Sequence, residues 1–116
     1  MKLTIKRWQW LRGCEGSLCN RHGDMDVLGH YFIACGHKPD DIWMMGTPYS
    51  TSITPDDRLG VLTCDESEFP EWAWSWRYRI VDELMQVNDD DELTEEDREQ
   101  TLIMLFADIG VELEFT

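Results

Sequence analysis

VDELMQVNDDDELTEEDREQTLIMLFADIGVELEFT, residues 81–116, contains the patterns that decide the fold. Thr94 precedes three acidic residues, which is typical of a helix N-cap followed by negative charge in the first turn. Gly110 is a signal for the end of that helix. Between the two signals, apolar residues recur at three- and four-residue spacing: Leu102, Leu105, Phe106 and Ile109. We therefore expect a helix that begins at about Glu95 and buries one apolar stripe.

The apolar period changes to two at each end of the chain. The last residues alternate between apolar and acidic side chains: Val111, Leu113 and Phe115 against Glu112 and Glu114. In residues 2–7, Leu3 and Ile5 alternate with Lys2, Thr4 and Lys6 in the same way. Both ends are expected to form strands of one sheet. Lysines of the first strand would then face glutamates of the last, at about 0.2–1 kcal/mol per pair. The pattern leaves the direction of pairing open.

A second helix is expected at Met25 to Cys35. Its apolar residues form a helical stripe that Gly36 ends: Val27, Leu28, Tyr31, Phe32 and Cys35. Gly29 inside this helix costs up to about 1 kcal/mol relative to alanine. Its presence is easier to understand if another element packs closely against it.

The middle of the chain has mixed signals. Tryptophan and tyrosine alternate with smaller residues between Phe69 and Ile80, yet the same segment continues into a helical stripe, and we favour a helix from about Pro70 to Val87. A weak strand is expected at Ser17 to His22 and a short helix from Pro39 to about Met45. Thr47 to Leu59 reads as a long loop, and a short strand is expected at Gly60 to Cys64.

The predicted fold is α+β, a single domain over residues 1–116. A small β-sheet that includes the N- and C-terminal strands packs against about three helices. The length suits one domain with a core of its own, and 42% apolar residues with six tryptophans can fill that core.

Negative charge is concentrated in the second half of the chain. The net charge is −14. Residues 1–53 hold six basic and five acidic side chains, whereas residues 54–116 hold four and nineteen. Such a surface repels nucleic acid and anionic membranes, and it attracts basic proteins, including those that hold DNA or RNA. The alternative is a solubilising face with no partner.

No leader and no apolar run of the ~20 residues needed to span a bilayer is readable, so we expect a cytoplasmic protein. Four cysteines without a leader favour reduced thiols over disulfides. Cys14, Cys19 and His22 are the best candidates for a zinc site, but they lack the usual tight knuckle and second pair. We therefore expect no cofactor, no zinc and no disulfide.

A calcium loop and a cysteine–histidine catalytic pair are each supported by only part of their pattern. Residues 88–99 place oxygen side chains at several calcium-loop positions, but Leu93 stands where the sharp turn needs glycine. Cysteine–histidine pairs, Cys35 with His30 or His37 and Cys19 with His22, carry no recognisable catalytic signature.

Core packing accounts for most of the tryptophans, while one or two, at Trp72 and Trp74, are candidates for anchoring a protein partner.

Three segments, MKLTIKRxxWLRG, LGHYFIACG and VNDDxxLTEEDREQxLxxLFADIGVELEF, resemble short uncharacterised proteins of phages, prophages and mobile elements. The resemblance covers about half of the chain and implies a viral or mobile-element setting without an activity. In those proteins a pair of cysteines precedes the Leu-Gly, whereas this chain has Asp26 and Val27 there. That departure argues against a thiol function.

The expected function is protein binding, by an acidic accessory protein that inhibits a host nucleic-acid-handling or defence protein. The expected contact residues are Asp89, Asp90, Asp91, Glu92, Glu95, Glu96, Trp72 and Trp74. Two alternatives remain open: a small enzyme or zinc protein that uses the N-terminal cysteines and histidines, and an accessory structural subunit.

Overall fold

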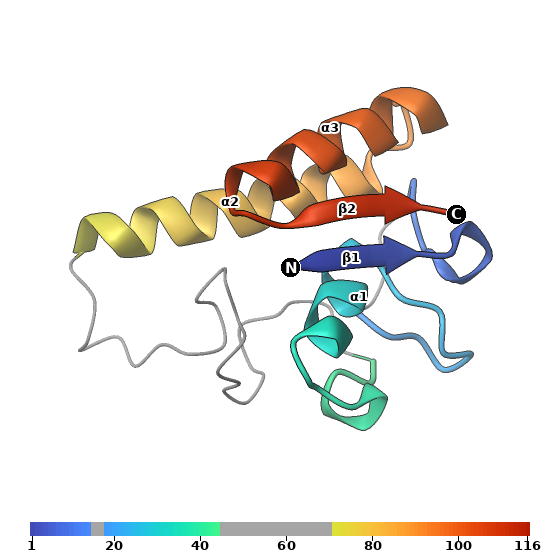
Figure 1. Ribbon diagram of the computed structural model, residues 1–116. Coiled ribbons are helices and arrows are strands. Elements are labelled where there is room, and N and C mark those ends of the chain that lie inside the picture. Colours follow the sequence, from blue (N-terminus) through green and yellow to red (C-terminus); the bar gives the residue numbers. More distant parts are fainter. Residues whose placement is uncertain (15–17, 45–70) are drawn as a thin grey trace.

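The computed structural model describes residues 1–14, 18–44 and 71–116, without the side chains of residues 71–78. In these ranges the fold is α+β, as expected: two strands, three α-helices and two short 3-10 helices. In chain order they are β1 (Lys2–Ile5), η1 (Arg7–Gln9), α1 (Val27–Ala34), η2 (Pro39–Asp41), α2 (Glu71–Asp89), α3 (Glu95–Asp108) and β2 (Glu112–Phe115). Figure 1 shows β2 between β1 and α3, with α1 beside β1.

The two ends of the chain pair with each other in a parallel two-stranded sheet. The register runs from Lys2 opposite Glu112 to Ile5 opposite Phe115. Lys2 Nζ lies 3.0 Å from a carboxylate oxygen of Glu114, which confirms one of the expected lysine–glutamate contacts. The expectation that the terminal strands share one sheet is therefore correct, and the structure adds that they are parallel.

The core lies between the sheet and the helices. Leu3, Ile5 and Leu113 are buried on the inner face of the sheet, as the alternation predicts. Phe115 is only half-buried; its ring packs on Trp10, with the ring centroids 4.4 Å apart. From the helices, every apolar residue of the stripe expected for α1 is buried. The described parts of α2 and α3 supply five further buried apolar side chains: Ile80, Val81, Leu84, Leu102 and Phe106.

The helix ends follow their sequence signals. The hydroxyl of Thr94 accepts a hydrogen bond from the backbone N–H of Asp97 at 3.2 Å, so α3 begins where the N-cap predicts. At the other end, Gly110 adopts a φ of +80°, which glycine tolerates without strain. Val111 N–H then donates to the carbonyl of Phe106 at 2.9 Å, which closes the helix and turns the chain into β2.

Gly29 lies where α1 crosses the segment that contains Leu18. A Cβ atom at this position would overlap the carbonyl oxygen of Leu18. The close approach expected for this glycine is therefore present, and it offsets the poor helix propensity of the residue.

Other expectations in the middle of the chain are met in part. The segment after Pro70 is a helix that extends to Asp89. The helix expected from Pro39 is limited to the three residues of η2, and Met44 beyond it has a positive φ of 57°. In the segment expected as a weak strand, Cys19 forms an isolated bridge with Trp43. The loop at 47–59 and the strand expected at 60–64 lie outside the described residues.

Candidate functional site

The candidate site is the turn between α2 and α3, which carries three of the expected acidic contact residues, with three more in the helices that it joins. Arg98 hydrogen-bonds to the backbone of this turn. Its side chain is buried, and its Nη2 donates to the backbone carbonyls of Asp90 and, at 3.3 Å, Leu93. A buried, charged side chain therefore stabilises the turn through hydrogen bonds to two of its carbonyl groups.

Asn88 connects the end of α2 to the N-terminal half of the chain. Its buried side-chain oxygen accepts from Trp10 Nε1 at 2.8 Å and from the backbone N–H of Val27 at 3.1 Å. Its amide nitrogen donates to the carbonyl of Leu11 at 3.0 Å and to a carboxylate oxygen of Asp89 at 2.8 Å. The first position of the rejected calcium loop is therefore a structural residue, with its side-chain oxygen already occupied.

Glu95 belongs to an ion-pair network within the protein. Its carboxylate lies 2.9 Å from Arg12 and 2.7 Å from Arg98. The hydrogen bond from Arg12, with the charge of both guanidinium groups, lowers the pKa of Glu95 below its ordinary value. Arg7 and Glu99 form a second pair beside this network, with Nη2 and Oε2 3.0 Å apart. The structure thus gives Glu95, an expected partner-binding residue, two basic neighbours of its own.

Besides the paired Glu95, four of the expected contact residues are exposed to solvent on the turn and the first turn of α3: Asp90, Asp91, Glu92 and Glu96. We call these four residues the acidic turn. None of them forms an ion pair with a basic side chain in the part of the chain that the structure describes. One oxygen of Asp90 accepts from the backbone N–H of Glu92 at 2.9 Å, which shapes the loop. Asp89 is half-buried and bonded to Asn88.

Two buried titratable groups, Asp26 and His30, lie at the N-terminus of α1 and in its first half. Asp26 is the N-cap of this helix, and its carboxylate accepts from the backbone N–H of Gly29 at 2.8 Å. Burial, reinforced by the charge of Asp89, raises the pKa of Asp26 to about 7. His30 lies 3.2 Å from the carbonyl of Gln9 through its Nε2, and burial lowers its pKa, so its neutral form is favoured.

The residues weighed for zinc have different environments. Cys14 and His22 are exposed, whereas Cys19 is buried, and burial raises the pKa of its thiol. The Cys19 Sγ lies 3.6 Å from the carbonyl of Asn20, to which it donates, rather than bonding to His22. In residues 1–14, 18–44 and 71–116, no three histidine, cysteine or acidic side chains are grouped so that they could hold a metal ion.

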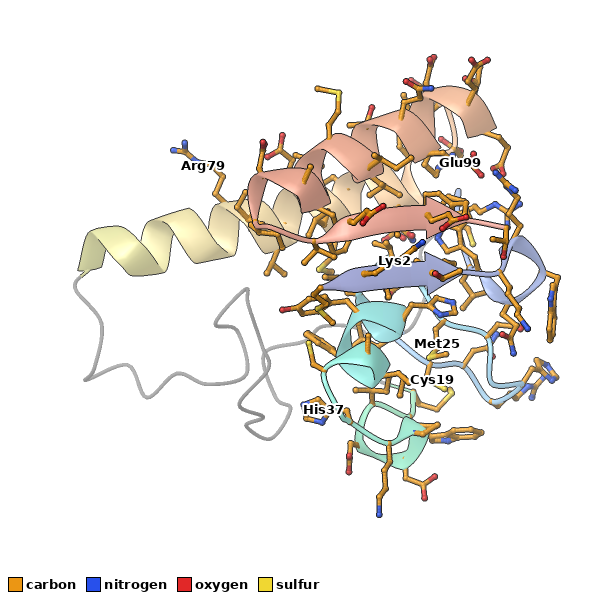
Figure 2. All side chains as sticks on the ribbon, viewed as in Figure 1. Lys2, Cys19, Met25, His37, Arg79 and Glu99 are labelled. Atoms are coloured by element: carbon orange, nitrogen blue, oxygen red, sulfur yellow. The ribbon has the colours of Figure 1, made fainter. Side chains whose placement is uncertain are left out.

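The two tryptophan candidates lie on α2, since Trp72 and Trp74 fall in its first turns. Their side chains are outside the described residues, so their role as anchors stays a prediction. Figure 2 shows the described side chains, with Arg79 of the same helix pointing away from the sheet.

Sequence reasoning missed the two residues that shape the turn. Arg98 is the one basic residue among ten carboxylates between Asp82 and Glu99, and that isolation was a usable signal. Asn88 had no such signal, because its partners Trp10, Leu11 and Val27 are far away in sequence.

No protein-family model, curated protein or solved structure matches this chain. Among the helices that the structure describes, none combines the length and apolar character required to cross a bilayer.

Proposed function

We propose that this protein acts by binding a basic surface of another protein through the acidic turn. The observation that carries the proposal is the contrast between two sets of carboxylates on one segment. Glu95 and Glu99 are paired with arginines of the same chain, whereas Asp90, Asp91, Glu92 and Glu96 face solvent without a described basic partner.

The turn is also held in shape before any partner arrives. Arg98 fixes its carbonyl groups, Thr94 caps α3, and Asn88 fastens the end of α2 to the core. A loop held in this way loses little conformational entropy on binding, which favours affinity. Clustered negative charge additionally speeds association with a basic surface.

The partner class follows from charge. Surfaces that hold DNA or RNA are strongly basic because they neutralise phosphates, so a nucleic-acid-handling or defence protein of the host is the proposed target. The resemblance to phage and mobile-element proteins implies only a setting, and inhibition of a host protein is the role that we propose in that setting. Direct binding of nucleic acid is not part of the proposal, because like charges repel.

The test has two stages. Affinity purification from a host followed by mass spectrometry identifies the partner. Association rates are then measured at several salt concentrations for the parent and for a variant with Asp91→Asn, Glu92→Gln and Glu96→Gln. The variant should associate more slowly, and its rate should depend less on salt.

A matched control removes the same charge from exposed positions elsewhere: Asp40→Asn, Glu83→Gln and Asp108→Asn. Thermal melts of all three proteins separate binding from folding. If the turn variant and the control bind the partner at the parent's rate and with the parent's salt slope, the acidic turn only solubilises the protein.

A further inference from the structure

A hollow lies between the C-terminal half of α3 and the beginning of β2. Its volume is about 310 Å³, and it is lined by Ile103, Ala107, Gly110, Val111, Glu112 and Leu113. No residue of β1 lines it, so the hollow lies on the side of β2 away from its strand partner. Its lining residues on α3 are in the C-terminal half of the helix, whereas the acidic turn is at the N-terminal end. Figure 1 shows these two ends of α3.

The edge of β2 that faces away from β1 has backbone groups with no hydrogen-bond partner among the described residues. Glu112 and Thr116 donate their N–H groups to β1, to Met1 and Ile5, each at 2.9 Å. Backbone groups alternate in direction along a strand, so the N–H and C=O groups of Leu113 and Phe115 point to the other edge. In the described part of the chain, no group hydrogen-bonds to either N–H. Such an edge is a template for another strand.

The helix beside this edge exposes apolar side chains. Met104 is 68% exposed and Ile103 is 39% exposed, although both belong to a helix whose other face is in the core. Together with the exposed Ala107, they form an apolar strip along α3. Apolar groups of this kind beside an open strand edge are typical of sites that receive an extended peptide.

Acidic side chains lie at the hollow and next to it in sequence. Glu112 is an exposed lining residue on the strand side, and Asp108, which is also exposed, follows the lining residue Ala107 at the end of α3. We call Glu112 and Asp108 the acidic rim. Glu114, the next outward residue of β2, pairs with Lys2. An occupant of complementary charge therefore carries lysine or arginine at positions that flank the apolar contacts.

We propose that the outer edge of β2 and the apolar strip of α3 form a docking groove for an extended segment of a partner protein with alternating apolar and basic residues. The segment adds to the sheet as a third strand and bonds to the backbone of Leu113 and Phe115. Its apolar side chains enter the hollow beside Ile103 and Ala107. This surface is separate from the acidic turn, so it does not depend on the function proposed for that turn.

A second copy of this chain fits the groove less well. The exposed residues of β2 are Glu112 and Glu114, so edge-to-edge pairing of two β2 strands would bring glutamates of both copies together. Like charges directly opposite each other in a sheet are destabilising.

The probe is an acetylated eight-residue peptide in which lysine alternates with valine, added to the isotope-labelled full chain and followed by NMR. Hydrogen exchange at the amides of Leu113 and Phe115 should slow by about tenfold or more at saturation. A peptide with serine in place of lysine should bind more weakly, because it lacks charges for the acidic rim.

Ala107→Arg tests the groove by filling it. This position is exposed, and arginine is a good helix former, so the fold should persist. The Lys–Val peptide should bind this variant about tenfold or more weakly. Gln86→Arg, which makes the same charge change on an exposed position of α2, should bind it like the parent.

Three outcomes would overturn the proposal. The first is no change at the amides of Leu113 and Phe115 at millimolar peptide. The second is changes confined to residues 90–96, which would mean that the peptide binds only the acidic turn. Sedimentation of the protein alone could instead show a dimer that Ala107→Arg disrupts, and the occupant would then be a second copy.

Discussion

Asp26 caps α1, but its burial destabilises the charged form of its carboxyl group. Its carboxylate bonds to the N–H of Gly29, which stabilises α1, but it is buried and near the charge of Asp89. Burial is the larger effect, and it raises the pKa of Asp26 to about 7 from an ordinary value of 3.8. At pH values between these two pKa values, Asp26 holds a proton in the folded protein that it has released in the unfolded chain. The stability of the fold therefore falls as pH rises through this window.

Asp26→Asn should remove this dependence, because asparagine is an equally good N-cap and does not titrate. Relative to the parent, the variant should gain on the order of 2 kcal/mol between pH 5 and pH 8. Urea unfolding of both proteins across that range measures the difference. Groups that do not interact with the charge of Asp26, such as His30, contribute alike to both proteins and cancel. Parallel pH profiles would show that Asp26 titrates at its ordinary pKa and that the cost is absent.

Gly29 affects both the local stability of α1 and the packing of this helix against the Leu18 segment. The pattern of α1 could be read from sequence because its apolar stripe and its terminal Gly36 are local signals. The crossing with the Leu18 segment is a tertiary contact, and the glycine only hinted at it. Local propensity and tertiary packing conflict at this position, and packing decides it: a residue unfavourable for the helix is the one that permits the crossing.

Gly29→Ala tests this crossing. On propensity alone the change would stabilise α1 by up to about 1 kcal/mol. Overlap of the new methyl group with the Leu18 carbonyl should instead destabilise the fold by about 2 kcal/mol or more, since a backbone group cannot rotate away as a side chain can. Denaturant unfolding gives the sign directly, with Ala34→Ser at the exposed end of α1 as the control. A variant more stable than the parent would mean that the Leu18 segment moves freely.

The elements themselves were largely predictable, and the site was predictable only in part. Caps, terminal glycines and apolar periods act over a few residues, so α3, α1 and the strand patterns could be read directly. The parallel direction of β1 and β2 could not, because the whole chain separates them and no turn sets their register. Likewise, composition marked the acidic segment but could not tell Glu95 from Glu96. Arg12, which distinguishes them, is far away in sequence.

Charge acts on the molecule as a whole as well as on the acidic turn. A net charge of −14 on 116 residues makes the compact state repel itself. A few ion pairs oppose this, including Lys2 with Glu114 and Arg7 with Glu99, but they are at the surface and contribute little each. Repulsion should therefore be the larger of the two effects at low salt.

Added salt should consequently stabilise this fold, although it weakens individual ion pairs and slows partner association. Raising sodium chloride from about 0.01 M to 0.1 M shortens the screening length from about 30 Å to about 10 Å. The melting temperature should rise by about 4 °C or more, the shift expected for about 1 kcal/mol in a small domain. Choline chloride at equal ionic strength is the control: an equal rise indicates screening, whereas a larger rise with sodium indicates cation binding. A melting temperature that falls steadily with either salt would mean that the surface ion pairs outweigh the repulsion, and that the excess of carboxylates costs the fold little.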